Sequence, residues 1–287
     1  MNNDNDTSSI SFTAHYTGYV WHHYGLSDSH FATTRGKLFF MLLRPFERIA
    51  RCLIGSDIKT TLLQRHFLID RELDALIATH PGLQILEIAC GLSPRGHRFT
   101  RRHAGISYVE ADLPGMVARK HALLAQLGSL DARHRLVTCN ILDRGTPDSL
   151  EAVIAREFDA GKPLVVITEG LVNYFDLATI SGVWRRLATA LRTFPLGVYL
   201  TDIYPEVGGH RFSGAIRASN RALRVASRSS FTLHFASDGS MRAHFASLGF
   251  AQVEVFDPDR ERTAAPAARG GAIVRVVKAS AEEPGRQ

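Results

Sequence analysis

The sequence predicts an α/β fold: a Rossmann-like, seven-stranded, mainly parallel sheet with helices on both faces and an N-terminal helical and aromatic lid. Two observations predict it. Apolar runs of strand length alternate with amphipathic segments of helix length from residue 84 onward, and this alternation requires parallel strands joined by crossover helices. The first strand also runs into a glycine turn followed by a helix, as in nucleotide-binding sheets.

The N-terminal part is expected to lie outside the sheet. It begins with polar residues and continues through a stretch rich in aromatic residues and histidine. Two helices follow, the first interrupted at Pro45 and the second ended by Pro81 and Gly82. These pieces are residues 1–12, 13–35, 37–54 and 59–79.

The α/β region is predicted from periodicity. The expected strands are residues 84–89, 106–111, 135–139, 164–168, 197–203, 251–256 and 272–278. The expected helices are residues 94–103, 114–128, 147–158, 176–193 and 239–248. A helix inserted over residues 211–228 and a short extra strand over residues 231–235 break this rhythm.

Composition bounds the class of protein. The 287 residues are 45% hydrophobic and 22% charged, as in a globular domain. We expect a lid over residues 1–58, the α/β domain over residues 59–280 and a disordered tail over residues 281–287. The three cysteines, Cys52, Cys90 and Cys139, lack paired or metal-type spacing, which predicts reduced thiols.

Charge and hydropathy exclude several partners. The net charge is +6, but the arginines are dispersed and do not alternate with aromatic residues, so no nucleic-acid partner is expected. The N-terminus lacks the basic start and apolar core of a signal peptide. The longest apolar stretch, residues 38–43, is far shorter than the ~20 residues of a membrane span. We therefore expect a cytoplasmic protein with no membrane partner.

The glycine turn after the first strand indicates the cofactor. Gly91 lets the backbone approach a ligand that a side chain would block. The dinucleotide fingerprint Gly-x-Gly-x-x-Gly is absent, because Ala89 and Pro94 occupy two of its positions. An acidic residue inside the strand, Glu87, together with a single glycine favours S-adenosylmethionine (SAM), which has no pyrophosphate.

The second strand ends in two carboxylates, Glu110 and Asp112, about 20 residues after the glycine turn. A sheet of this class places the carboxylate that binds ribose hydroxyls at this distance. An ionised carboxylate suits that role because it only accepts hydrogen bonds. The alternative is that Asp112 caps the helix that begins near Pro114; the two roles are compatible.

Three motifs occur in an order that resembles a known family. They are residues 87–95, residues 108–114 with Lys120, and residues 168–175. Together they resemble the leucine carboxyl methyltransferase family, including its bacterial polyketide O-methyltransferases of the tetracenomycin type, over roughly residues 60–205. The resemblance implies a class I SAM-dependent methyltransferase fold with SAM as the methyl donor.

The family's substrates leave the acceptor open. We expect O-methylation of a carboxyl or hydroxyl group on a small molecule of secondary metabolism. The alternatives are methylation of a protein C-terminal carboxylate and a catalytically silent SAM-binding partner subunit. An NAD-dependent oxidoreductase would need the glycine-rich fingerprint that residues 89–96 do not supply.

The resemblance also implies cofactor contacts at the ends of the third and fourth strands. Asn140 and Ile141 would bracket the adenine, although Asn140 could simply end a strand. Glu169 would bind the amino end of SAM, since a carboxylate at the end of a buried strand needs a cation. Tyr174 would line the wall between SAM and the acceptor, unless it is an ordinary core tyrosine.

Two arginines are candidates for the α-carboxylate of SAM. Arg65 resembles the arginine of the family's N-terminal helix, and Arg95 matches the arginine of its glycine loop. Either guanidinium could bind a carboxylate through two hydrogen bonds. We favour Arg65 as the direct ligand, with Arg95 ordering the loop.

The first 60 residues depart from the family, and their aromatic segment is the expected lid over the acceptor. The candidate acceptor-binding residues are Tyr16, Tyr19, Trp21, His22, His23 and Tyr24. No metal is expected, because the histidines lack a matched cysteine or carboxylate spacing. A carboxylate acceptor needs no base, whereas a phenol would profit from one; His22, His23 and Tyr174 are the catalytic candidates.

Overall fold

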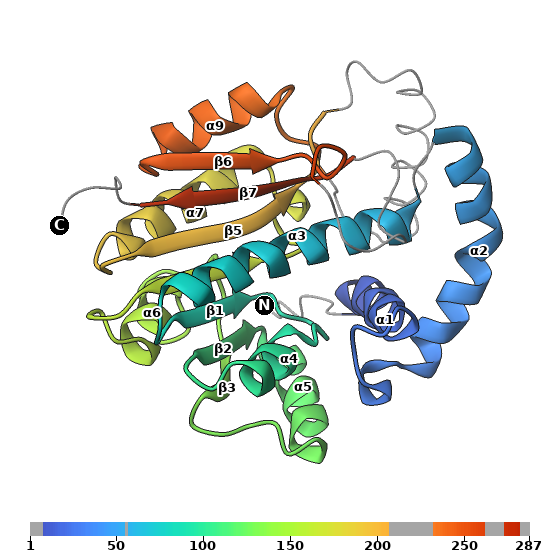
Figure 1. Cartoon of the computed structure of the whole chain (residues 1–287), viewed down its shortest axis with the longest axis horizontal. Helices are drawn as coiled ribbons and strands as arrows, with labels where there is room; N and C mark the ends of the chain where they lie inside the picture. Colours follow the sequence, from blue (N-terminus) through green and yellow to red (C-terminus); the bar gives the residue numbers. More distant parts are fainter. Residues whose placement is uncertain (1–7, 55–56, 207–231, 262–272, 282–287) are drawn as a thin grey trace, which may run out of the picture.

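The computed structural model describes residues 8–54, 57–206, 232–261 and 273–281. Within these ranges the chain forms a seven-stranded sheet with helices on both faces (Figure 1). The fold class predicted from the sequence is therefore confirmed.

The sheet has the order β3-β2-β1-β4-β5-β7-β6. Strands β1 to β5 pair in parallel, and β7 runs antiparallel to both β5 and β6. The strands are β1 (Gln84–Ile88), β2 (Ser107–Asp112), β3 (His134–Thr138), β4 (Leu164–Thr168), β5 (Gly197–Ile203), β6 (Gln252–Phe256) and β7 (Arg275–Ser280). The chain changes direction across the sheet between β1 and β4, which is the switch point where such sheets bind ligands.

The helices cover the two faces of the sheet and extend beyond one end (Figure 1). They are α1 (Ser8–His23), α2 (Thr34–Ile54), α3 (Ile58–Thr79), α4 (Arg95–Arg102), α5 (Pro114–Gln126), α6 (Leu150–Glu157), α7 (Leu177–Leu191) and α9 (Asp238–Ser247). Two short 3-10 turns are η1 (Ser29–Phe31) and η2 (Val172–Tyr174). Each strand predicted for the sheet, and each helix predicted between its strands within the described ranges, is present.

The predictions differ from the structure mainly near the N-terminus. Residues 8–23 form α1, where a polar tail and a mixed segment were expected. Helix α2 continues through Pro45 without a break. A proline removes one backbone hydrogen bond, yet residues on both sides of Pro45 remain helical.

Two further predicted elements lie near or inside gaps of the described chain. The extra strand predicted at residues 231–235 is wrong for its described part, because residues 232–235 belong to no strand. They are held instead by single backbone bonds, from Thr232 N–H to the Asn173 carbonyl and from His234 N–H to the Tyr204 carbonyl. The predicted helix over residues 211–228 lies outside the described residues.

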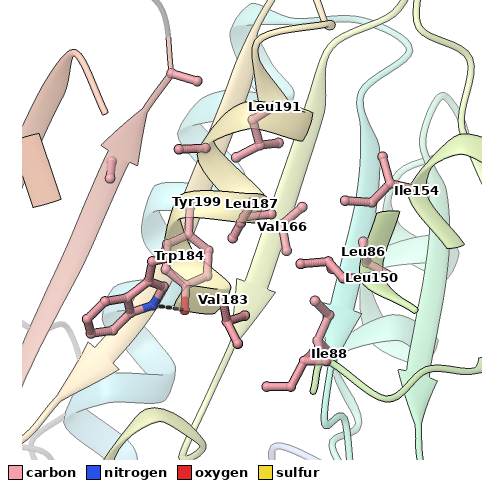
Figure 2. Packing of buried hydrophobic residues seen from close by; sticks show 14 of the residues in the cluster. Leu86, Ile88, Leu150, Ile154, Val166, Val183, Trp184, Leu187, Leu191 and Tyr199 are labelled. Carbon is pink, nitrogen blue, oxygen red and sulfur yellow. Dashed lines mark hydrogen bonds between the residues drawn. The ribbon is translucent and has the colours of Figure 1, made fainter. Parts of the chain in front are cut away.

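Two apolar layers bury the sheet, as parallel strands require. On one face, Ile69 of α3 and Phe99 of α4 join Val165 and other strand residues in a single buried cluster. Helices α6, α7 and α9 cover the other face. Figure 2 shows buried residues of α6 and α7 packed against residues of the strands. There the indole N–H of Trp184 donates to the Tyr199 hydroxyl across 3.2 Å, which satisfies a polar group inside the core.

A smaller apolar core joins α1 and α2 to the start of α3. Tyr16, Val20, Phe40, Leu62 and Leu63 are buried in it. The two helices approach closely where α2 begins, because a Cβ atom at position 36 would collide with the carbonyl oxygen of residue 15. A glycine is therefore needed at position 36, and the helical pair lies beside the switch-point end of the sheet (Figure 1).

Candidate functional site

The carboxyl ends of β1, β2, β4 and β5 meet at one edge of the sheet. They bring two carboxylates next to two backbone N–H groups. The Asp112 carboxylate, at the end of β2, accepts a hydrogen bond from the Gly91 N–H after β1 across 2.8 Å. The Asp202 carboxylate, on β5, accepts one from the Gly170 N–H after β4 across 2.6 Å. Helix α3 crosses this edge. It contributes Asp70 and His66, which contact Arg95, and it contributes a second arginine, Arg65.

Arg95, the first residue of α4, forms hydrogen bonds to three carboxylates. Its guanidinium donates to Asp70 across 2.7 Å, to Glu87 across 2.6 Å and to Glu169 across 2.5 Å. Glu87 also accepts a hydrogen bond from the Tyr108 hydroxyl across 2.7 Å. The Arg95 side chain is fully buried, so it ties the glycine loop to three other elements.

Arg65, on α3, lies nearer to solvent. Its guanidinium donates to Glu169 across 3.1 Å and to Asp202 across 3.0 Å. Its side chain retains 8% exposure, against none for Arg95. Gly170 has a φ of +70°, and a Cβ atom there would lie 2.8 Å from an Arg65 nitrogen. Glycine is therefore required both for the turn and for the approach of Arg65.

Glu169 is the junction between the two arginines. A third partner, the His66 imidazole, lies 3.0 Å from its second oxygen. Burial alone would raise the pKa of Glu169, but the facing charges of His66 and Arg95 hold that pKa well below its ordinary value. The pKa of Asp70 is lowered in the same way, against the effect of burial, by His66 and Arg95. Both carboxylates are therefore ionised at neutral pH.

The cluster has an excess of carboxylate groups. Its four carboxylates outnumber its three guanidinium groups by one, and the His66 imidazole lies against two of the carboxylates. The residues are Asp70, Glu87, Glu169, Asp202, Arg65, Arg95 and Arg98. The excess is felt at Asp202, whose pKa is raised by burial and by the Glu169 charge despite Arg65. A positively charged ligand group would offset this charge.

The two carboxylates of β2 have different surroundings. Asp112 is partly exposed and accepts from the Gly91 and Leu113 N–H groups, which leaves lone pairs on both oxygens. Glu110 is fully buried and forms an ion pair with Lys120 across 3.0 Å. Gly96 closes over this pair, since a Cβ atom there would collide with the Glu110 carboxylate. Of the two, Asp112 is the one within reach of a ligand.

At the end of β3, the structure shows the local role of Asn140. Its side-chain oxygen accepts from the Leu142 N–H across 3.1 Å, and its amide donates to Asp143 across 2.9 Å. This is the turn that the simpler interpretation of Asn140 required. Ile141 is 7% exposed and joins the apolar layer beneath α6 and α7.

The aromatic residues of α1 point in several directions, because a helix distributes neighbouring side chains around its axis. Trp21 turns toward the cluster, with its ring centroid 5.0 Å from that of His66. Gly18, on the same helix, lies against Leu92 of the glycine loop, with the distance from an added Cβ atom to Leu92 being 3.6 Å. Helix α1 therefore contacts both the charged cluster and the glycine loop.

The other predicted lid residues make contacts within the lid. Three rings of α1 contact Phe40 of α2, with centroid distances of 4.7–6.3 Å. They belong to Tyr16, Tyr19 and His23. Tyr24 packs edge-on against His23 at 5.1 Å. His22 lies at the end of the helix, with its Nδ1 atom 3.4 Å from the Ser27 carbonyl. Trp21 thus provides the ring contact that links the lid to the charged cluster.

Several residues of the site were not predicted from the sequence. Asp202 lies near the end of an apolar strand just as Glu169 follows one, so the same signal could have found it. Tyr204 accepts a hydrogen bond from Arg65 across 3.3 Å. Asn173 joins the segment after β5 to residue 232, because its amide donates to the Tyr204 and Thr232 carbonyls across 3.2 and 2.6 Å. Against the effect of burial, the pKa of Arg65 is raised mainly by Asp202, with Tyr204, Glu169 and Tyr174 contributing.

Two other kinds of site find no support in the described part of the chain. There, no group of three or more histidine, cysteine, aspartate or glutamate side chains is arranged to hold a metal ion. None of the described helices is both long enough and apolar enough to cross a membrane. Cys90 and Cys139 are buried free thiols, as predicted, while the side chain of Cys52 lies outside the described part.

Comparison with known proteins supports the resemblance found in the sequence. The profile of the leucine carboxyl methyltransferase family matches residues 45–188. A Mycobacterium ulcerans protein assigned by name to the S-adenosyl-L-methionine-dependent methyltransferases is 28% identical over 143 residues. That match covers 50% of this chain and 45% of the relative, and a Mycobacterium marinum protein matches to the same extent. The match thus spans less than half the length of these relatives.

Solved structures share the fold. A DUF574 family protein from Streptomyces avermitilis superposes with a TM-score of 0.60, at 17% identity, over 93% of this chain and 96% of that one. A protein from Thermobifida fusca, named as a methyltransferase, gives a TM-score of 0.56 at 14% identity, over 93% of each chain. At these identities the likeness concerns the fold alone.

Proposed function

The chain belongs to the leucine carboxyl methyltransferase family, and from this premise we propose that it binds SAM and methylates an oxygen of a small-molecule acceptor. The observation that carries the proposal is the buried cluster at the switch point, in which four carboxylates face three guanidinium groups. SAM has an ammonium, a sulfonium and a carboxylate, so it would bring one net positive charge to this cluster.

The residues present fit the parts of SAM. Arg65 would bind the α-carboxylate, because it is the more accessible of the two arginines. Glu169 would accept from the ammonium group, and Asp112 would accept from the ribose hydroxyls with its remaining lone pairs. Gly91, with a φ of +48°, turns the loop beside them. The adenine contacts of Asn140 and Ile141 remain part of the proposal.

Other predicted contact residues would act indirectly. Arg95 and Glu87 are bound to each other and enclosed, so they would hold the glycine loop in place. Glu110 would anchor Lys120, whose ammonium group lies 3.5 Å from the Cys90 carbonyl of the same loop. These groups preorganise the cofactor site without touching the ligand.

Bound SAM supplies an activated methyl group, so the chain's own task is to align the acceptor and exclude water. Helix α1 would provide the cover through Trp21. Tyr174 and Tyr204 lie beside Arg65 at the ends of β4 and β5. Burial raises the pKa of Tyr204 to about 12, so its hydroxyl stays protonated and donates hydrogen bonds.

Such a hydroxyl favours an acceptor that arrives ionised. A carboxylate, with an ordinary pKa of about 4, needs no base, and the protonated Tyr204 hydroxyl would donate a hydrogen bond to one of its oxygens. The predicted bases His22 and His23 contact the Ser27 carbonyl and the Phe40 ring respectively. We therefore propose a small carboxylic acid as the preferred acceptor, with a phenol as the competing choice.

The proposal is tested in two steps. Thermal unfolding with SAM, S-adenosylhomocysteine and NAD should show stabilisation by the first two only, since a ligand stabilises the state that binds it. Mass spectrometry should then detect methylated products from a panel of small carboxylic acids and phenols. Alkaline hydrolysis removes a methyl ester and leaves a methyl ether. Stabilisation by NAD alone, or products that resist hydrolysis, would contradict the cofactor and the acceptor assignment respectively.

A further inference from the structure

The outer side of α2 exposes an unusual set of apolar side chains. Leu38, Met41 and Leu42 are 54%, 51% and 59% exposed. Among the described residues, three of the four exposed large apolar side chains lie on this one helix, the fourth being Leu142. Spacings of three and four residues place the three on one side of the helix. Phe40, 5% exposed, faces the opposite side, toward α1.

Positive side chains flank this apolar face. Arg35, Lys37 and Arg44 are exposed, and residues 34–46 contain no aspartate or glutamate. At roughly 100° per residue, Arg35 lies on one flank of the face, while Lys37 and Arg44 lie on the other. Figure 1 shows α2 at the edge of the molecule, with α1 on its inner side. The first three turns of α2 thus combine an exposed apolar stripe with cationic borders.

We propose that this face of α2 docks the protein on an anionic lipid surface. Leucine and methionine side chains would enter the boundary between headgroups and acyl chains, while arginine and lysine would contact the headgroups. Each basic side chain near such a surface contributes about 1 kcal/mol. The expectation of no membrane contact rested on the length needed to span a bilayer, and a helix that lies in the interface needs no such length.

A second copy of the chain is a less favourable occupant. A two-fold contact would place the same surface on both sides, so the positively charged borders of one copy would lie close to those of the other. No acidic side chain of residues 34–46 is available to offset that repulsion. Anionic lipid headgroups supply the missing charge. The proposal does not depend on methyl transfer, because it rests on α2 alone.

The test uses the full chain with vesicles of phosphatidylcholine alone or mixed with phosphatidylglycerol. We expect the protein to sediment with the mixed vesicles, to remain in solution with phosphatidylcholine, and to be released by high salt. The double substitution Leu38→Gln and Leu42→Gln should weaken sedimentation at least tenfold, whereas Leu142→Gln should leave it unchanged. SAM-dependent thermal stabilisation of the double variant verifies its fold independently.

Three outcomes would overturn the proposal. The first is a wild-type protein that ignores the mixed vesicles, and the second is a double variant that binds them as well as wild type. The third is a dimer, detected by light scattering, that the double substitution converts to monomer without any vesicle binding by the wild type. That result would assign the face to a second copy.

Discussion

The Asp202 carboxylate accepts a hydrogen bond from the backbone N–H of Gly170 across 2.6 Å. This contact links the end of β5 to the turn after β4, next to the junction carboxylate Glu169. The other oxygen of Asp202 accepts from Arg65 across 3.0 Å. One buried carboxylate thus fixes both a backbone turn and the arginine that we assign to the cofactor.

The substitution Asp202→Asn should weaken SAM binding without unfolding the protein. The amide oxygen can still accept from Gly170, but the charge that orients Arg65 is lost. Hydrogen bonds to charged groups contribute about 1.5–3 kcal/mol, so we expect SAM affinity to fall by roughly tenfold or more. Titration calorimetry measures this, with Asp159→Asn at an exposed turn as the matched control. Equal affinities for both variants would remove Asp202 from the site.

The same carboxylate should make the affinity for SAM decrease as the pH is lowered. Asp202 has a raised pKa, above the ordinary aspartate value of 3.8, whereas the pKa values of Glu169 and Asp70 are lowered, so Asp202 takes up a proton before these two. Its protonation removes a negative charge that attracts a cation. Calorimetry in buffers of different ionisation enthalpy should detect proton release on binding in this range, and Asp202→Asn should abolish the release. A pH-independent affinity would contradict the charge argument.

Stability should respond to pH with the opposite sign for different members of the cluster. Glu169 and Asp70 have lowered pKa values, so their contribution is complete above their unfolded pKa and is lost as the pH falls through the folded one. Asp202, with its raised pKa, contributes below its unfolded pKa and loses this contribution as the pH rises through the folded one. The free energy of unfolding of Glu169→Gln should therefore fall less steeply with acid than that of wild type, in chemical denaturation at a series of pH values. Equal slopes would show that Glu169 is not held ionised by its partners.

Substitution of Arg65 and substitution of Arg95 should have different effects. Arg65→Ala should lower SAM affinity and destabilise the fold less than Arg95→Ala, because Arg65 pairs with two buried carboxylates and Arg95 with three. Arg95→Ala would leave Asp70, Glu87 and Glu169 without their shared partner, and breaking a buried pair costs about 3–5 kcal/mol. Denaturant unfolding and SAM titration of both variants separate the two effects. A larger loss of affinity at Arg95 in a fully folded variant would reverse the assignment.

The carboxylates of β2 provide an internal comparison. Asp112→Ala should weaken SAM by about 1–3 kcal/mol, the cost of an unsatisfied ligand group, with little loss of stability. Glu110→Ala should instead destabilise the fold by about 3–5 kcal/mol, since Lys120 would remain buried without its partner. Denaturant unfolding and SAM titration measure the two effects. Unchanged SAM affinity in Asp112→Ala would exclude its role at the ribose.

The sheet was predictable because its signals are local. Strands such as Leu164–Thr168 are continuous apolar runs, and the predicted boundaries agree with the structure there. Polar residues at strand ends identified Asp112 and Glu169 for the same reason. Asp202 carries the same signal, but it lies within a seven-residue strand, near its end, rather than after it. Its buried carboxylate needs a positively charged partner, and that partner, Arg65, is 137 positions away in the sequence.

The lid was harder to predict because its pattern depends on tertiary contacts. Tyr16, Tyr19 and His23 resemble pocket residues by composition, yet they pack on Phe40, which lies in another helix. Glu110 and Asp112 pose a similar difficulty, because they are two residues apart on the same side of one strand and their local patterns are alike. Their difference depends on distant residues, a glycine at position 96 and a lysine at position 120, which close over the deeper carboxylate.

The last prediction concerns Trp21 as the contact between lid and site. Its ring lies 5.0 Å from that of His66, and His66 bonds to Glu169, so a ligand at Glu169 should change the surroundings of the indole. The chain has only two tryptophans, and the other, Trp184, is enclosed in the core against Tyr199 (Figure 2). Addition of SAM should therefore change the fluorescence of the wild type but not of Trp21→Phe. Trp21→Ala should in addition lower kcat by about tenfold or more, because misalignment and water entry both slow transfer, whereas Trp21→Phe keeps an aromatic cover and should retain most of it. A fluorescence change of equal size in Trp21→Phe would place the signal at Trp184 and remove Trp21 from the site.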